Sequence, residues 1–237
     1  MDNRISVLLD TDIGANIDDA ACLAYLLGEP RCELVGITTV SGHAQKRARL
    51  ADAICRAAGR DAISIASGTE RPILVPQRRT SVPQTEVLSD WPHSTDFEPF
   101  AAVRFMRKMI RNRPGEITLV AVGPLTNVGL LFALDEKIPS LLKSLWVMGG
   151  AYFDGDRLET NFRSDPHAAA VVLANPPADT RIHGLDVTLQ CTQSADDCLS
   201  LFRGGTLDVI GQMAEVFFRE RSSLTFHDPL AAACACN

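Results

Sequence analysis

The sequence predicts an α/β protein, built on an open, mostly parallel β-sheet with helices on both faces. Short apolar or β-branched runs alternate with segments of helical periodicity along the chain, a pattern that favours βαβ units. Polar residues also recur directly after the apolar runs, as they do where the carboxyl ends of parallel strands share one edge. No Ser/Gly/Pro-rich linker or repeat divides the 237 residues, so we expect a single domain, 1–237.

The first two elements are a strand and a helix. Residues 5–9 form a short apolar run typical of a fully buried strand. Ala20, Leu23 and Leu27 then recur at helical spacing. Further strands are predicted at 32–40, 62–66, 117–122, 145–148 and 180–185. Further helices are predicted at 44–58 and 101–113, after Gly123 and Asp165, twice over 194–221, and from 226 to the end.

Residues 72–99 break this alternation. The segment holds five prolines and the pair Arg78-Arg79, which predicts a long irregular loop with at most short pieces of regular structure. Loops of this length in compact domains are often active-site lids. An ordered surface excursion is an equally good interpretation from the sequence.

Composition excludes several classes of protein. The net charge of −6 lacks the basic footprint of a nucleic-acid-binding protein. No apolar run approaches the ~20 residues of a membrane-spanning helix, and Met1 to Arg4 lead straight into the first strand without a signal peptide. Seven scattered cysteines without metal-finger spacing indicate reduced thiols, so we expect a cytoplasmic protein.

The stretch around which the chain is organised contains four carboxylates in ten residues: Asp10, Asp12, Asp18 and Asp19. These anions repel one another, and the only basic residue before Arg31 is Arg4, at the far end of the strand. We therefore expect a bound metal ion as the compensating charge. Carboxylate oxygens are hard ligands, which favours Ca²⁺ or Mg²⁺. Negative charge at a helix N-terminus would alone explain only the last two aspartates.

Two known acidic motifs fit this stretch poorly. An EF-hand loop beginning at Asp10 needs a glycine and a glutamate where Ala15 and Ala21 stand. A haloacid-dehalogenase-like phosphotransferase would use Asp10 as nucleophile and Asp12 as acid around Mg²⁺. However, Gly14 stands where that family has Thr or Val, and no downstream lysine motif is evident.

Six segments form a more consistent set. They are Asp10-Thr-Asp12-Ile-Gly14 with Asp18-Asp19-Ala20, then 36–42, 119–127, Val147-Met148-Gly-Gly150, Glu159-x-Asn161-x-x-x-Asp165-Pro166, and His227-Asp228-Pro229-Leu230. In this order they resemble the motifs of the inosine-uridine-preferring nucleoside hydrolases. The resemblance implies a Rossmann-like nucleoside hydrolase fold, a nucleoside substrate, Ca²⁺ as cofactor and a homo-oligomer, either dimer or tetramer. A degenerate member that binds nucleosides without turnover is the non-enzymatic alternative.

The resemblance also implies roles for the acidic residues. Hydrolysis of the N-glycosidic bond would give ribose and a free nucleobase. The implied metal ligands are Asp12, Asp19, Asp228 and the main-chain carbonyl of Thr126. Asp12 would also accept a proton from the attacking water, and Asp10 would orient the ligands from the second shell. His227 would face the nucleobase and protonate the leaving group. Thr126 as an N-cap and Asp228-Pro229 as a helix start are the structural alternatives.

The remaining implied roles concern the substrate. Asp18, Glu159 and Asn161 would hold ribose hydroxyls, and Met148 would line the sugar pocket. His43 stands where many members have a ribose-contacting asparagine. Family members continue well beyond the His-Asp-Pro segment, so we expect a C-terminally truncated form of the fold. The sequence does not predict a preference for purine or pyrimidine nucleosides.

Overall fold

The computed structural model describes residues 4–153, 155 and 157–237. Its central feature is a parallel sheet, which has six strands within the described residues, in the order β3-β2-β1-β4-β5-β6. The strands are β1 (Ile5–Thr11), β2 (Cys32–Thr39), β3 (Ile65–Ser67), β4 (Ile117–Ala121), β5 (Ser144–Met148) and β6 (Thr180–His183). The predicted fold class, an open parallel sheet flanked by helices, is confirmed.

Strand β1 occupies the centre of the sheet because its side chains are apolar on both faces. Val7 and Leu9 pack into the core on one face, and Leu8 packs into the core on the other. All three side chains are fully buried. A strand covered on both faces reads as a continuous apolar run, which is the pattern that predicted it.

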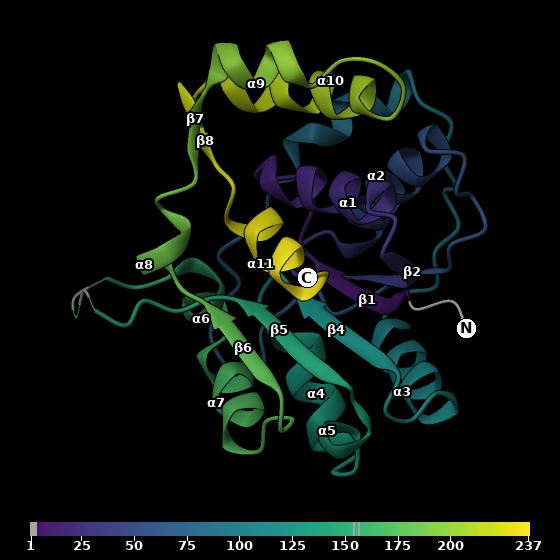
Figure 1. Cartoon of the computed structure of the whole chain (residues 1–237), viewed down its shortest axis with the longest axis vertical. Helices are drawn as coiled ribbons and strands as arrows, with labels where there is room; N and C mark the ends of the chain where they lie inside the picture. Colours follow the sequence, from purple (N-terminus) through teal and green to yellow (C-terminus); the bar gives the residue numbers. More distant parts are fainter. Residues whose placement is uncertain (1–3, 154, 156) are drawn as a thin grey trace.

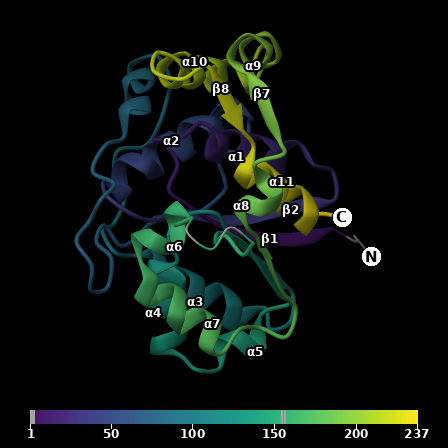
Figure 2. The ribbon, with the colours of Figure 1, turned by 90° about the vertical axis from the view of Figure 1, so that its left-hand side faces the viewer.

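Helices cover both faces (Figure 1). The core on one face includes residues from α1 (Asp18–Gly28), α2 (Ala44–Ala57), α10 (Leu207–Phe218) and α11 (His227–Ala235). The core on the other includes residues from α3 (Ala102–Asn112), α4 (Thr126–Leu134), α5 (Ile138–Leu141) and α7 (Pro166–Ala174). Figure 2 shows this second group below the sheet and α10 at the opposite end of the molecule.

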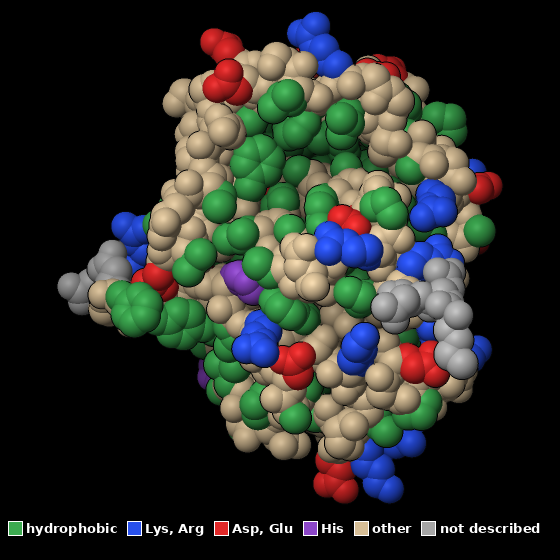
Figure 3. All heavy atoms as spheres, in the orientation of Figure 1, with side chains coloured by type: hydrophobic (Ala, Val, Ile, Leu, Met, Phe, Trp, Pro, Cys, Tyr) green, Lys and Arg blue, Asp and Glu red, His purple; other side chains and the backbone are tan. Residues whose placement is uncertain are grey.

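A smaller layer of helices and strands lies beyond α1. It contains α9 (Ala195–Leu201), α10 and an antiparallel pair of strands, β7 (Thr192–Ser194) and β8 (Ser223–Thr225). Hydrophobic side chains show on the molecular surface between this layer and α11 (Figure 3). The short elements α6 (Thr160–Ser164) and α8 (Leu185–Thr188) follow strands β5 and β6.

The segment predicted as a long loop connects β3 to α3. Residues 72–99 contain one regular element, the 3₁₀ helix η1 (Pro83–Ser89), in agreement with the prediction. This helix packs against α2 and α10. The predicted boundaries of the other strands and helices mostly lie within a few residues of the observed ones. Within the described residues, no helix is both long enough and apolar enough to span a bilayer.

The strand order places a crevice beside β1. The connections from β1 run to β2 and β3 on one side, and the chain then crosses to β4, β5 and β6 on the other. Ligands of open α/β sheets bind outside the carboxyl ends of the strands where the order reverses in this way. The fold therefore directs the loops after β1, β4 and β5 toward one place.

Candidate functional site

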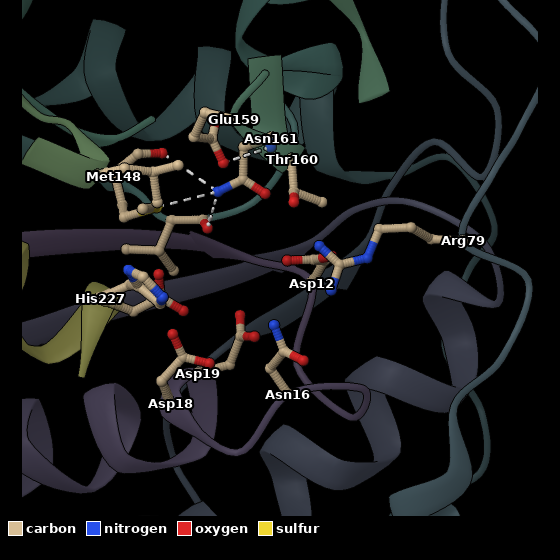
Figure 4. A pocket seen from close by; sticks show the side chains of 13 residues that line it. Asp12, Asn16, Asp18, Asp19, Arg79, Met148, Glu159, Thr160, Asn161 and His227 are labelled. Atoms are coloured by element: carbon tan, nitrogen blue, oxygen red, sulfur yellow. Dashed lines mark hydrogen bonds and ion pairs between the residues drawn. The ribbon is translucent and has the colours of Figure 1, made fainter. Parts of the chain in front are cut away.

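A polar pocket lies at this reversal of the strand order. Its lining comes from the loop after β1, the ends of β4 and β5, helix α6, and the start of α11. The lining residues are Asp12, Asn16, Asp18, Asp19, Arg79, Val122, Met148, Glu159, Thr160, Asn161, Leu185, His227 and Asp228. Most of the residues predicted from the sequence therefore meet in one cavity (Figure 4).

Three carboxylates form the floor of the pocket. Asp18 and Asp19 begin α1, and Asp228 is in the first turn of α11, which packs directly against α1. One oxygen from each lies within 4.8 Å of the other two, and all three side chains are buried. Two helix N-termini thus bring together anions that are more than 200 residues apart in the sequence.

Burial and mutual repulsion make these carboxylates difficult to ionise. Burial is the larger cause and the charge of Asp12 the smaller one, and together they raise the pKa of Asp18 to about 7. Burial and the charges of the neighbouring aspartates raise the pKa values of Asp19 and Asp228 well above the ordinary range of a carboxyl group. A cation at this point would remove the repulsion, because opposite charge favours the ionised form.

The donor set fits a hard divalent cation. Three buried carboxylates converge within a distance that one ion can bridge, since Ca²⁺ binds oxygen ligands at about 2.3–2.6 Å. Asp12 Oδ2, in the same pocket, is buried and accepts no hydrogen bond from the described residues. A buried acceptor without a hydrogen bond is unusual, and this oxygen could serve as a further ligand of an ion.

The prediction that the acidic stretch lacks a nearby basic residue was wrong. Arg79 Nη1 lies 3.0 Å from Asp12 Oδ2, and the Arg79 side chain is only 16% exposed. Asp12 turns toward this guanidinium, on the opposite side of the pocket from Met148 and His227 (Figure 4). The contact is an ion pair without the alignment of a hydrogen bond.

A second arginine, Arg47, holds the backbone of the loop between β1 and α1. Arg47 of α2 is fully buried, and its guanidinium donates hydrogen bonds to the carbonyl oxygens of Asp12, Ile13 and Ser41. Burial lowers the pKa of this guanidinium, although the charge of Asp12 opposes that shift. Arg47 therefore fixes the backbone of the loop.

Asp10 lies behind the pocket, at the end of β1. Its Oδ1 accepts hydrogen bonds from Thr38 Oγ1 at 2.5 Å and from Asn127 Nδ2 at 2.8 Å. Burial raises the pKa of Asp10 to about 7 despite these bonds. Asn127 Nδ2 also donates to the carbonyl of Thr39, so this network connects the carboxyl ends of β1 and β2 with the start of α4. The position agrees with the predicted supporting role.

Asn161, Glu159 and Met148 form the opposite wall. Asn161 Nδ2 donates to the carbonyl oxygens of Val122 at 2.7 Å and Met148 at 3.2 Å. Both donor positions are thus used by the backbone, and the amide oxygen is the group left to accept a bond in the pocket. Glu159 caps α6, since its carboxylate accepts from the backbone N–H groups of Asn161, Phe162 and Gly150.

His227 lies at the edge of the pocket nearest Met148 (Figure 4). Its Nδ1 lies 2.7 Å from Thr188 Oγ1 of α8, which fixes the orientation of the ring and leaves Nε2 as its other polar atom. Burial lowers the pKa of His227 below its ordinary value.

Besides Asp10, two residues predicted from motifs are absent from the described lining of this pocket. His43 directly precedes α2 and its side chain is exposed, because the turn at Gly42 leads the chain into the helix and away from the carboxylates. Thr126 begins α4, where its hydroxyl donates to Asp165 Oδ2 at 2.7 Å. The Thr126 hydroxyl therefore does not cap α4, whose N-cap position is Leu125 without a side-chain cap bond; it links α4 to Asp165, the N-cap residue of α7.

A family model described as inosine-uridine preferring nucleoside hydrolase matches residues 7–237. The chain belongs to the inosine-uridine preferring nucleoside hydrolase family. Uridine nucleosidase 1 of Arabidopsis thaliana is 32% identical over 227 residues, covering 90% of this chain and 66% of the relative. Non-specific ribonucleoside hydrolase RihC of Salmonella newport (strain SL254) is 33% identical over 248 residues, covering 98% of this chain and 79% of the relative.

Solved structures named as nucleoside or ribonucleoside hydrolases share the fold. A plant nucleoside hydrolase, PpNRh1, has a TM-score of 0.84 at 23% identity and covers 98% of this chain and 79% of its own. A purine-preferring ribonucleoside hydrolase from Gardnerella vaginalis has a TM-score of 0.82 at 23% identity, covering 98% and 80%. The chain spans 60–66% of the length of three plant relatives named as established or probable uridine nucleosidases.

Within this nucleoside hydrolase family member, sequence reasoning missed the part played by the loop 72–99. The pair Arg78-Arg79 was noticed, but no periodicity or motif connected it to the acidic stretch. Asn16, which lies between Gly14 and Asp18 in that stretch, was also missed and lines the pocket beside Asp12. The arginine pair in a long loop is the one sequence signal for Arg79, and it does not locate the side chain beside the acidic stretch.

Proposed function

We propose that the chain hydrolyses the N-glycosidic bond of ribonucleosides, releasing ribose and a free nucleobase, with Ca²⁺ as cofactor. The observation that carries the proposal is the meeting of Asp18, Asp19 and Asp228 beside Asp12 in a buried pocket of a nucleoside hydrolase family member. The relatives with higher sequence identity include a uridine nucleosidase and a non-specific ribonucleoside hydrolase, which supports a nucleoside as the substrate class.

Asp19, Asp228 and Asp12 would hold the ion, with the main-chain carbonyl of Thr126 as a further candidate ligand. When bound, the cation supplies positive charge that polarises and orients a water and the ribose hydroxyls. Asp12 accepts the proton of the attacking water, which is the task of a general base. Its proximity to Asp18 and Asp19 also places negative charge where the sugar becomes cationic in the transition state.

The substrate contacts follow from the walls of the pocket. Asp18 and the amide oxygen of Asn161 accept hydrogen bonds from ribose hydroxyls. Glu159 keeps Asn161 in place through its cap of α6, and its carboxylate also faces the pocket. Met148 packs against the sugar, and His227 donates a proton to the departing nucleobase. His43 has no place in this proposal, because its exposed side chain lies outside the described lining.

Release of reducing sugar tests the proposal directly. The ion-free chain is incubated with inosine, uridine, adenosine or cytidine, with and without Ca²⁺, and ribose and free base are quantified. We expect ribose and base in equal amounts, only with the ion. Saturable nucleoside binding without release of ribose would instead favour the non-catalytic alternative, and hydrolysis of phosphate esters would favour the phosphotransferase alternative.

Two further parts of the proposal concern the setting of the protein. All seven cysteines are free of disulfide bonds, which supports a reduced, cytoplasmic protein.

A homo-oligomer, dimer or tetramer, is proposed from the resemblance to the family. Sedimentation equilibrium of the full chain, with and without Ca²⁺, tests the assembly.

A further inference from the structure

We propose that Arg79 competes with the divalent cation for Asp12. In the ion-free protein the guanidinium neutralises this carboxylate, and loading the ion displaces Arg79 from it. Arg79 is then a positioning residue whose position sets the affinity of the site for its metal. The inference rests on the proposed metal-dependent function.

The first argument is the geometry of Asp12. Asp18, Asp19 and Asp228 already bring oxygens within 4.8 Å of one another. Asp12 turns its Oδ2 toward Arg79 Nη1 instead, at 3.0 Å. Both partners line the same pocket, and the charge of Asp12 is the largest cause that raises the pKa of Arg79. One carboxylate oxygen therefore has two possible positive partners.

The second argument is that the fold delivers Arg79 to this position. Gln77 Oε1 accepts a hydrogen bond from the Arg79 backbone N–H at 2.8 Å. The Arg79 carbonyl packs so closely on Gly42, which has φ +60°, that a side chain at that position would collide with it. Farther along the same loop, Gln84 donates to the carbonyl oxygens of Gly14 and Ala15. The segment that carries Arg79 is thus held against Gly42 at one point and against Gly14 and Ala15, in the loop between β1 and α1, at another.

The third argument is that only the side chain of Asp12 is free to exchange partners. Arg47 holds the Asp12 carbonyl, so the backbone cannot carry the carboxylate toward the other three. Oδ2 accepts no hydrogen bond from any described residue and is held by charge alone. An ion pair without aligned hydrogen bonds is weaker and less directional than a bidentate pair. A divalent ion therefore finds an available ligand beside a cation that it repels.

Calorimetric titration of Ca²⁺ into the ion-free full chain tests the competition. Arg79→Gln removes the competing charge and keeps a polar side chain of similar length, whereas Arg78→Gln makes the same change at the exposed neighbour. We expect Arg79→Gln to bind Ca²⁺ at least ~10-fold more tightly than the parent, a difference of about 1.4 kcal/mol. Arg78→Gln should stay within about twofold of the parent, a ratio far below the tenfold step.

Thermal unfolding of the same proteins gives a second readout with a characteristic change of sign. Without the ion, Arg79→Gln should unfold at a lower temperature than the parent, because Asp12 loses its buried cationic partner. With saturating Ca²⁺ this deficit should disappear or reverse. A residue that merely supports the loop would lower stability in both states.

A measurement on the unaltered protein protects the test against a variant that does not fold. Phenylglyoxal modifies exposed guanidinium groups, and peptide mass spectrometry reports Arg78 and Arg79 separately. We expect Ca²⁺ to accelerate modification of Arg79 and to leave Arg78 unchanged. Equal or weaker Ca²⁺ binding by Arg79→Gln, or unchanged modification of Arg79, would overturn the competition alone. Absence of Ca²⁺ binding by the parent and by Arg79→Gln would overturn the proposed metal dependence as well.

Discussion

Removal of the divalent ion should destabilise the protein, and by an amount that depends on pH. The perturbation is chelation with EDTA during unfolding and refolding, followed by thermal unfolding with and without added Ca²⁺. An ion at 100 times its Kd stabilises the folded state by about 2.7 kcal/mol. For a chain of this size each kcal/mol shifts Tm by about 2–4 °C, so the expected shift at pH 8 is about 5–11 °C.

The sign of the pH dependence follows from the buried carboxyl groups. The folded-state pKa values of Asp10 and Asp18 are raised to about 7, above the unfolded values near 4. Such groups contribute stability that is present below the unfolded pKa and is lost as the pH rises through the folded pKa. The ion-free protein should therefore unfold at a lower temperature at pH 8 than at pH 5.5.

Two carboxylates with lowered pKa values, Asp135 and Glu29, do not titrate in this window. Hydrogen bonds from Arg111 and Arg107 lower the pKa of Asp135, and Arg31 lowers that of Glu29 to about 2. These groups stay ionised throughout the interval, so they contribute little to the change. Ca²⁺ needs deprotonated ligands, and its stabilising effect should consequently be small at pH 5.5 and large at pH 8.

Two variants make the experiment specific to the site. Asp228→Asn removes one of the converging anions, so it should flatten the ion-free pH dependence and reduce the shift produced by Ca²⁺. Asp61→Asn makes the same chemical change at an exposed position and should behave like the parent. The reasoning would be refuted if the ion-free parent were equally stable at pH 5.5 and pH 8, or if chelation left its Tm unchanged at pH 8.

Three more outcomes are expected. Asp12→Asn keeps a ligand oxygen but loses the base, so turnover should fall by ~10²–10⁴-fold and more Ca²⁺ should be retained than in Asp12→Ala. Single-turnover kinetics measures the rate, and calorimetry measures Ca²⁺ binding. Turnover at the parental rate would show that Asp12 is not the base. His227→Ala should slow hydrolysis of inosine far more than that of a nitrophenyl riboside, whose leaving group needs no proton; equal losses on the two substrates would contradict the role of acid. Arg47→Met should lower stability by about 3–5 kcal/mol by leaving buried carbonyl oxygens without a donor; urea unfolding measures it, and a loss below 1 kcal/mol would argue against the clamp.

The fold was predictable where burial leaves a pattern in the sequence. Strand β1 is apolar on both faces because both are covered, and the sequence run 5–9 shows this directly. Strands β7 and β8 were missed because each has three residues and β7 is fully exposed. Neither alternation nor an apolar run can mark a strand that has no buried face.

The site was predictable where it coincides with element ends. Asp18 and Asp19 meet Asp228 because α1 and α11 both begin at the carboxyl edge of the sheet, and strand–helix alternation predicts such a meeting. Arg79 was not predictable, because its place depends on backbone bonds such as Gln84 N–H to the Gly14 carbonyl. Such contacts between two irregular loops carry no sequence period.

The sequence argument for a metal was that no basic residue lies near the four aspartates. Arg79 contradicts that argument, because its guanidinium pairs with Asp12 in the folded protein. The balance of charge in the folded pocket restores the argument. One guanidinium, that of Arg79, faces four aspartates, which are Asp12, Asp18, Asp19 and Asp228, while the fifth carboxylate of the lining, that of Glu159, accepts backbone hydrogen bonds. Burial and repulsion still raise the pKa values of Asp18, Asp19 and Asp228 with Arg79 in place. Arg79 compensates one anion, and the carboxylates that it does not pair with are the three that converge. The folded geometry therefore supports the proposed cation site, and it places that site at the three carboxylates that Arg79 does not pair with.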